Sequence, residues 1–261
     1  MAFMQVDFFS EVLGMCTHMN VILPEENKGA IGMDGTKEMK SWKVLYLLHG
    51  LSDDYTIWQR QTSIERHAAG KPVVIVMPET QRGWYTDMKY GFKWFTYFTE
   101  ELPVIVKNFF PRVSTKREDT FVAGLSMGGY GAMKMGLGDP EHFSACASLS
   151  GALDVCKYLR GEDERHRYFS NIFGDLDELE GSDNDLFALA GKLKAEGKPV
   201  PKVFMWCGTE DGLLDSNERF SAHLDTLGID HVYNTSSGDH QWQYWDDQIK
   251  AVLDWLPLRG R

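Results

Sequence analysis

The chain has 261 residues, of which 43% are hydrophobic and 25% are charged, so it can bury a substantial core and wholesale disorder is excluded. Its formal net charge of −11 would repel a phosphate backbone or an anionic membrane surface, so we expect neither nucleic acid nor membrane as a partner. The first residues show no basic segment followed by an apolar stretch, and no later apolar run approaches the length of a membrane span. We therefore expect one cytoplasmic domain over residues 1–261, with a homo-oligomer left open.

The four cysteines are far apart in the sequence and none forms a C-x-x-C pair: Cys16, Cys146, Cys156 and Cys207. This spacing argues against a zinc site and against a disulfide scaffold. We expect all four to be reduced packing residues.

The first half of the chain predicts a hairpin followed by a strand, a helix and a strand. Two β-prone runs, 5–10 and 17–24, flank a glycine-containing turn and indicate an antiparallel hairpin at a sheet edge. A polar connection leads to residues 42–48, whose nearly continuous apolar character is typical of a strand buried on both faces. A helical pattern over 57–69 precedes a second central strand at 72–78.

The second half continues the alternation of helix and strand. Helices are expected at 100–110, 127–138, 215–227 and 241–256, and strands at 120–125, 143–149, 202–207 and 231–234. This order predicts an α/β fold with a mostly parallel sheet and helices on both faces. A polar, acidic stretch interrupts the rhythm at 154–198; we expect a cap-like insertion over the sheet, with its own helix capped by Ser182 and with Asp185 three residues on.

Gly124-Leu125-Ser126-Met127-Gly128 matches G-x-S-x-G, with an apolar strand before it and a helix-forming run after it. A serine at such a sharp turn needs small neighbours, because the backbone is strained and folds back on itself. The turn also sets the hydroxyl at a helix N-terminus, where N–H groups favour developing negative charge. Ser126 is therefore the candidate nucleophile.

A serine hydroxyl is a weak nucleophile at neutral pH and needs a histidine base with an acid to orient it. On an α/β-hydrolase fold the acid and then the histidine follow the serine in the chain. Asp211 follows the strand at 202–207, and His240 lies between the last strand and the last helix. Glu210 and Asp239 remain rival acids, whereas we expect Asp215 to cap the next helix. His18, His67, His142, His166, His223 and His231 are interpreted as surface or structural residues.

The oxyanion hole should combine the N–H of Met127 with one from the loop that begins at His49. Gly50 lets the backbone approach closely, which makes the Leu51 N–H the second expected donor, while His49 is interpreted as a structural hydrogen-bonding residue. No H-E-x-x-H or calcium-loop pattern occurs, so we expect no metal and no cofactor.

These motifs, together with Trp58, Met77-Pro78-Glu79, Gly83-Trp84-Tyr85 and Asp239-His240, resemble the esterase D / tributyrin esterase family over nearly the whole chain. The resemblance implies an α/β-hydrolase fold, a triad of Ser126, Asp211 and His240, and hydrolysis of short-chain acyl esters, including acetyl and hydroxycinnamoyl esters. S-formylglutathione hydrolases of the wider family usually carry a cysteine shortly after the oxyanion-loop glycine. Here Ser52 and Asp53 follow Leu51, which makes that thioester a less favoured substrate.

Three functions remain open for this sequence: a short-acyl esterase, an acyltransferase that uses the same acyl-enzyme, and a silent binding module on the same fold. The triad residues in chain order favour the enzymes. The aromatic stretch that contains Trp84, Tyr85, Tyr90 and Trp94 would either line the substrate site or pack in the core.

Overall fold

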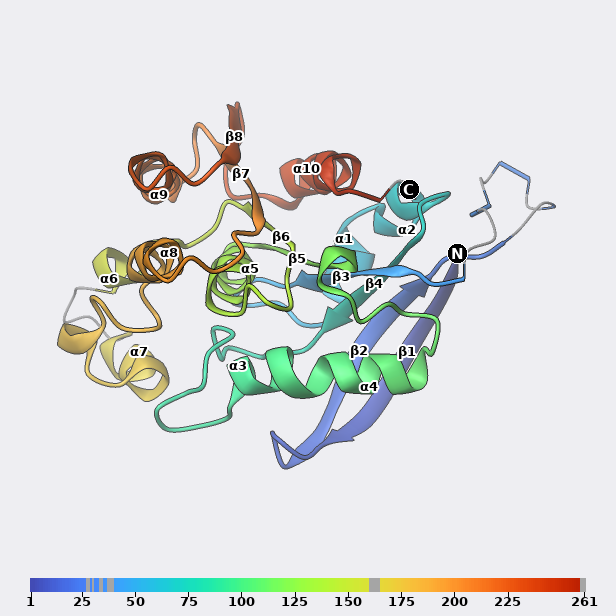
Figure 1. The fold of residues 1–261 in the computed structure, drawn as a ribbon, viewed down its shortest axis with the longest axis horizontal. Helices are drawn as coiled ribbons and strands as arrows, with labels where there is room; N and C mark the ends of the chain where they lie inside the picture. The colour runs from blue at the N-terminus through green and yellow to red at the C-terminus, as the bar shows by residue number, and fades with distance from the viewer. Residues whose placement is uncertain (27–28, 30, 33–34, 37–39, 160–164, 259–261) are drawn as a thin grey trace.

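The computed structural model describes residues 1–26, 29, 31–32, 35–36, 40–159 and 165–258. The acidic residues 162–164, which contribute to the expected charge of the insertion, lie outside this part of the chain. Within the described residues, eight strands form one sheet in the order β1-β2-β4-β3-β5-β6-β7-β8 (Figure 1).

The hairpin and the parallel strands occur in the expected order. The strands are β1 (Ala2–Ser10), β2 (Met15–Leu23), β3 (Lys43–Leu48), β4 (Val73–Pro78), β5 (Thr120–Leu125), β6 (Ala145–Leu149), β7 (Lys202–Gly208) and β8 (His231–Ser236). The β1–β2 hairpin is antiparallel and pairs through β2 with β4, whereas all pairs from β4 to β8 are parallel. This is the mostly parallel sheet that the sequence predicts.

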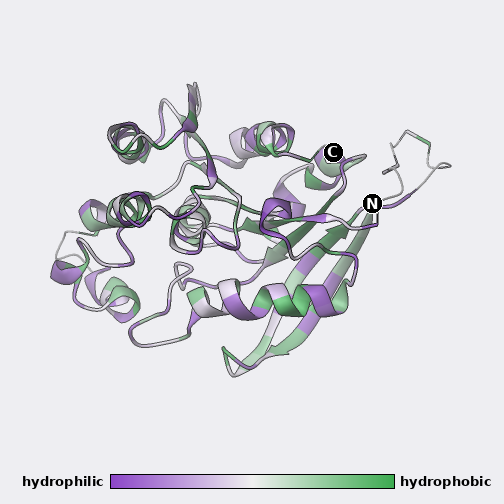
Figure 2. Ribbon diagram, in the orientation of Figure 1, coloured by the Kyte–Doolittle hydropathy of each residue, from purple (hydrophilic) through white to green (hydrophobic). Residues whose placement is uncertain are grey.

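Helices cover both faces of the sheet. One face carries α1 (Ile57–Gln61), α2 (Ile64–Ala68) and α10 (Trp242–Trp255), and the other carries α4 (Leu102–Phe109), α5 (Met127–Gly138), α8 (Leu186–Ala195) and α9 (Leu214–Thr226). Side chains along β5 alternate between the two cores, with Val122 in one and Phe121 and Ala123 in the other. Figure 2 shows the hydrophobic residues concentrated in these central strands.

The remaining short elements connect the layers. They are α3 (Trp94–Thr96), the π-helical turn η1 (Tyr97–Glu101), the 3₁₀ turns η2 (Arg117–Asp119) and η3 (Leu176–Glu178), α6 (Val155–Tyr158) and α7 (His166–Phe173). The insertion at 154–198 thus contains α6, α7, η3 and α8, and it packs beside α5 and α9 through α8.

Two expectations are wrong, for the helix at 57–69 and for the helix cap in the insertion. The helical pattern over 57–69 gives two short helices, because the Thr62 hydroxyl bonds back to the Trp58 carbonyl and the chain turns before Ile64. The helix of the insertion is capped by Asp185, whose Oδ1 accepts from the Phe187 N–H at 2.9 Å, while the Ser182 hydroxyl donates to the Leu179 carbonyl.

None of the four cysteines forms a disulfide in the described structure, but they do not all pack in the core. Cys146 and Cys207 are buried, whereas Cys16 is exposed and Cys156 is partly exposed. Burial raises the pKa of both buried thiols to about 12, so these two are inert packing residues. No helix among the described residues is both long and apolar enough to span a bilayer.

Candidate active site

The carboxyl ends of the parallel strands bring the predicted site residues to one edge of the sheet. His49 follows β3, Ser126 follows β5, Asp211 lies just after β7, and His240 lies in the loop after β8. Strands β3 and β5 are neighbours, as are β7 and β8, with β6 between the two pairs. Ligands of open α/β sheets bind at this edge, so the topology itself gathers the candidate groups.

Ser126 is the residue between β5 and α5, and its backbone is strained. Its φ of 53° and ψ of −118° are rare for a residue with a side chain. The turn is held on both sides, because the Ser126 N–H donates to the Leu149 carbonyl at 3.0 Å and its carbonyl accepts from the Ala152 N–H at 3.1 Å. The backbone of Ser126 is therefore held at the N-terminus of α5.

The glycines around Ser126 are required by close backbone contacts. A Cβ on Gly124 would lie 2.4 Å from the Gly128 carbonyl oxygen, and a Cβ on Gly128 would lie 2.5 Å from that of Leu48. The first turn of α5 therefore abuts the end of β3. This contact brings the Met127 amide and the loop after His49 to the same side of the site.

Asp211 and His240 form the hydrogen bond that the sequence predicts. His240 Nδ1 lies 2.8 Å from Asp211 Oδ2, and the second carboxylate oxygen accepts from the Leu213 N–H at 2.8 Å. Burial raises the pKa of Asp211, but the hydrogen bonds from His240 and Leu213 outweigh it and hold the pKa below its usual value. With the proton on Nδ1 facing an ionised carboxylate, Nε2 of His240 is free to accept a proton.

Two residues that the sequence reasoning missed hold this pair. Trp245 of α10 meets the His240 ring edge-to-face at 4.8 Å and donates its indole N–H to the Ser150 hydroxyl at 3.2 Å. Ser150 is fully buried, has a φ of 48°, and its hydroxyl helps to lower the pKa of Asp211. Its position directly after β6, at the same sheet edge, is the signal that could have identified Ser150.

The rival acid Glu210 has other partners. Glu210 accepts from the Gly238 N–H at 2.5 Å and from the hydroxyls of Thr209 and Ser237, so it ties the β7 loop to the histidine loop. Asp215 does not cap α9, because it lies inside the first turn and pairs with Lys157 at 2.9 Å. Asp211 is thus the carboxylate that reaches His240.

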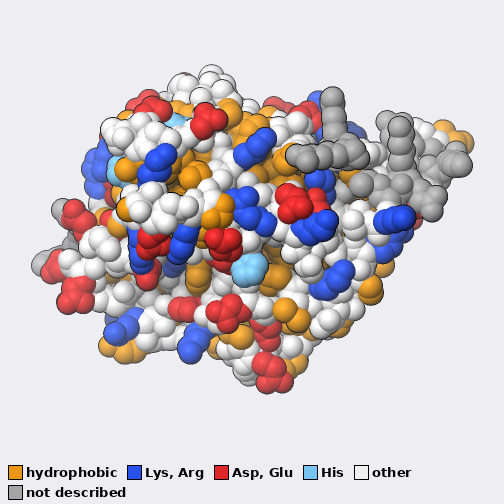
Figure 3. All heavy atoms as spheres, viewed as in Figure 1, with side chains coloured by type: hydrophobic (Ala, Val, Ile, Leu, Met, Phe, Trp, Pro, Cys, Tyr) orange, Lys and Arg blue, Asp and Glu red, His pale blue; other side chains and the backbone are white. Residues whose placement is uncertain are grey.

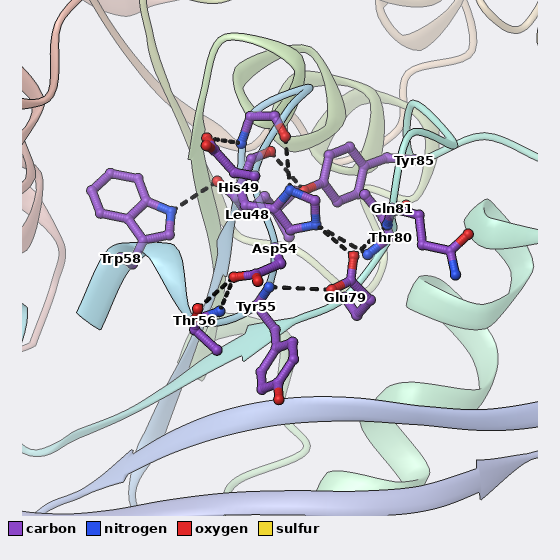
Figure 4. Close-up of polar contacts among 12 residues, drawn as sticks. Leu48, His49, Asp54, Tyr55, Thr56, Trp58, Glu79, Thr80, Gln81 and Tyr85 are labelled. Carbon is purple, nitrogen blue, oxygen red and sulfur yellow. Dashed lines mark hydrogen bonds and ion pairs between the residues drawn. The ribbon is translucent and has the colours of Figure 1, made fainter. Parts of the chain in front are cut away.

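The loop after β3 is held by the network around His49 (Figure 4). His49 Nδ1 donates to the Gly50 carbonyl at 2.8 Å, and Nε2 lies 3.1 Å from the Thr80 amide and 3.2 Å from a Glu79 oxygen. The Tyr85 hydroxyl donates to the His49 carbonyl at 2.8 Å. His49 is fully enclosed, so it supports the loop as the sequence suggests.

The amide groups of this loop are not equivalent. The Gly50 N–H donates to Asp53 Oδ2 at 3.2 Å, so that amide is already engaged. Leu51 is the next residue and is partly exposed. Its N–H and that of Met127 remain the predicted oxyanion donors.

Most of the aromatic residues near the site pack in the core. Trp84, Tyr85 and Trp94 are buried, and Trp84 meets Phe169 and Phe173 of α7 edge-to-face. Tyr90 is exposed. Loop 84–90 is tied to α7 through the amides of Lys89 and Tyr90, so it supports the insertion.

Comparisons with known proteins agree with this architecture. A family model described as "Putative esterase" matches residues 10–256. The acetyl esterase of Caldicellulosiruptor saccharolyticus is 34% identical, with 98% of each chain covered. Among solved structures, the fluorophosphonate-binding serine hydrolase F of Staphylococcus aureus superposes with a TM-score of 0.88 at 33% identity, covering 99% of both chains. The S-formylglutathione hydrolase of Staphylococcus aureus superposes with a TM-score of 0.84 at 33% identity, covering 98% of both chains.

Proposed function

Since this chain belongs to the esterase family and is a carboxylic ester hydrolase with the α/β-hydrolase fold, we propose that it cleaves short-chain acyl esters through an acyl-enzyme on Ser126. Acetyl esters are the expected natural class. The observation that carries the proposal is the bond between His240 and the buried Asp211 at the edge where Ser126 is held in a strained turn.

In this mechanism His240 Nε2 takes the proton of the Ser126 hydroxyl as its oxygen attacks the ester carbonyl. Asp211 fixes the ring with Nδ1–H toward the carboxylate and stabilises the imidazolium that forms. The amides of Leu51 and Met127 bind the oxyanion. His240 then protonates the leaving alcohol. In the second half of the reaction water attacks the acyl-enzyme while His240 takes its proton, and His240 returns this proton to Ser126 as the carboxylic acid leaves.

Two observations support a short acyl group. The acetyl esterase relative covers 98% of the chain, and the part of the insertion that the structure describes is rich in charge, with Asp175, Asp177, Glu178 and Asp183. A lipase that works at an oil surface needs a large apolar face instead. Each methylene that fits an apolar pocket adds about 0.8 kcal/mol of binding, so activity should rise with chain length until the pocket ends.

The test is kcat/KM for nitrophenyl esters from acetate to palmitate, with a hydroxycinnamoyl ester alongside. We expect a maximum between acetyl and butyryl. A maximum at octanoyl or beyond would overturn the short-acyl proposal and leave the Ser126 mechanism in place. Adding an alcohol to the same assay measures acyl transfer, which should stay below hydrolysis.

A thioester of the S-formyl type is the second candidate, favoured by the 33% identity to the Staphylococcus aureus S-formylglutathione hydrolase. The oxyanion loop reads Gly50-Leu51-Ser52-Asp53 here, without the cysteine typical of such enzymes. Comparing kcat/KM for S-formylglutathione and for nitrophenyl acetate separates the two. A thioester preference above about tenfold, or 1.4 kcal/mol, would make it the primary substrate.

A further inference from the structure

Lys134 is a buried cation that the proposed mechanism does not use. It lies in α5, eight residues after Ser126, which is about 12 Å further along the helix axis at 1.5 Å per residue. Its side chain is only 5% exposed. The Nζ atom is hydrogen-bonded to Thr86 Oγ1 and Asn184 Oδ1, both of which are uncharged oxygens.

No ion pair joins Lys134 to a carboxylate in the part of the chain that the structure describes. The rings of Phe95 and Tyr130 lie 5.2 and 6.0 Å from Nζ and supply only weak cation–π contact. Burial lowers the pKa of Lys134 from 10.5 to about 7, with Asp87 and Asp183 acting in the opposite direction. The ammonium thus has too little compensating charge around it.

A cavity of about 360 Å³ opens beside this ammonium, between α5, α8 and the loop that begins at Thr86. Its apolar wall consists of Phe95, Leu137, Leu189 and Leu193. A volume of this size is enough for a small organic molecule.

The charged groups at the mouth of the cavity are largely neutralised. Lys192 pairs with Asp183 at 3.1 Å and Lys198 pairs with Glu196 at 2.7 Å. Figure 3 shows basic and acidic side chains side by side on the surface over α8. Asp87 is the remaining carboxylate, and both of its oxygens accept from Thr96, at 2.9 and 2.7 Å. Among the described residues that line the cavity, Lys134 is therefore the basic group without a carboxylate partner.

We propose that this cavity is a second binding site, separate from the site at Ser126, for a small monocarboxylate with a short apolar chain. The carboxylate would pair with the Lys134 ammonium, whose third N–H is available once Thr86 and Asn184 hold two. The chain would lie against the leucines and Phe95. Dicarboxylates fit less well, because the second carboxylate would lie against the apolar wall.

Binding should strengthen as the pH falls, because the carboxylate binds the protonated amine. Above pH 7 the affinity should decrease by about tenfold per pH unit, as expected when binding takes up one proton. The charged groups that face Lys134 in the cavity are Asp87, Asp183, Glu196, Lys192 and Lys198. Their mutual ion pair lowers the pKa of Glu196 and raises that of Lys198, and burial raises the pKa of Tyr130, so these three groups should not add to this slope.

The test is calorimetric titration of the intact protein with sodium butyrate at pH 6 and pH 8, at constant ionic strength. Butanol and butylammonium are the neutral and cationic probes. We expect saturable butyrate binding at pH 6, at least tenfold weaker binding at pH 8, and none of either control probe. Lys134→Met should lose at least tenfold in affinity, whereas Lys194→Met, on α8 but outside the cavity lining, should change by less than twofold.

Equal butyrate binding by wild type and Lys134→Met would overturn the proposal, as would the absence of saturable binding at pH 6. Inhibition kinetics distinguish this site from the ester site. If butyrate competes with nitrophenyl acetate with an inhibition constant equal to its calorimetric dissociation constant, the bound butyrate lies at Ser126 and the proposal is overturned. Lys134→Gln, which keeps a hydrogen-bonding side chain, replaces Lys134→Met if circular dichroism shows the latter unfolded. If both unfold, the pH dependence and the kinetics of wild type decide.

Discussion

The Nδ1 atom of His240 lies 2.8 Å from Oδ2 of Asp211, although the two residues come from loops after different strands. The parallel pairing of β7 with β8 brings these loops together. The pKa of Asp211 lies below its usual value, so its contribution to stability is present above the unfolded pKa of about 3.9 and is lost as the pH falls through the folded value. The carboxylate therefore stays ionised at every pH at which an esterase is normally assayed.

Asp211→Asn should lower kcat by about three to four orders of magnitude, because an amide no longer holds the imidazole in the productive tautomer. The measurement is kcat on nitrophenyl acetate with circular dichroism as the check on folding. Asp215→Asn is the matched control, since Asp215 is exposed and pairs with Lys157. We expect its kcat to stay within about twofold of wild type. If Asp211→Asn were as active as wild type, another carboxylate would have to orient His240.

Ser126→Ala should abolish ester hydrolysis, with a loss of at least about a thousandfold, and leave the fold intact. The substitution removes only the hydroxyl, and the backbone bonds to Leu149 and Ala152 that hold the turn remain. Intact-mass analysis after treatment with a fluorophosphonate gives a second readout, since wild type should gain one adduct and Ser126→Ala none. An adduct on Ser126→Ala would move the nucleophile to another residue.

The alternation of strands and helices along the chain could be predicted because it depends on short-range signals. The apolar runs at 42–48, 72–78 and 120–125 each became a central strand, and G-x-S-x-G between strand and helix identified the turn at Ser126. The candidate acid and histidine followed from chain order. The candidate catalytic residues could be found from local sequence, and the order of the strands in the sheet then brings their loops to the same edge.

The positioning residues could not be predicted in this way because their roles depend on contacts across the sheet. Ser150 and Trp245 are 95 residues apart, and neither belongs to a sequence motif. The buried Lys134 is similar, since its partners Thr86 and Asn184 come from a loop and from the insertion. Helix α5 is buried along nearly its whole length, and the burial of Lys134 within it became clear only in the structure.

Gly128→Ala should destabilise the protein and reduce activity. The new Cβ would lie 2.5 Å from the Leu48 carbonyl and 2.7 Å from that of His49, so α5 must move away from the oxyanion loop. Overpacking of this kind costs about 1–3 kcal/mol, and the displaced Met127 amide should lower kcat as well. Denaturant unfolding and kcat measure the two effects.

Gly191→Ala is the matched control in α8, where a Cβ would meet no atom within 4 Å. Alanine is the better helix former, so this variant should gain about 0.5–1 kcal/mol of stability and keep wild-type kcat. If both glycine variants behaved alike, contact with the end of β3 would not be the reason for the glycine at 128.

Lys134→Met should flatten the dependence of stability on pH. The pKa of Lys134 falls from 10.5 to about 7 on folding, so between these values the unfolded chain binds the proton and the folded chain releases it. Stability conferred by this group therefore rises with pH across that window, by up to about 1.4 kcal/mol per pH unit. The methionine variant lacks this slope, and Thr86 can still donate to Asn184 at 2.5 Å, so no buried oxygen loses its last partner.

The measurement is the free energy of unfolding of both proteins at pH 7, 8 and 9 without added carboxylate. We expect Lys134→Met to be the more stable protein at pH 7 and its advantage to shrink by pH 9; parallel curves for the two proteins would mean that Lys134 does not titrate in this range.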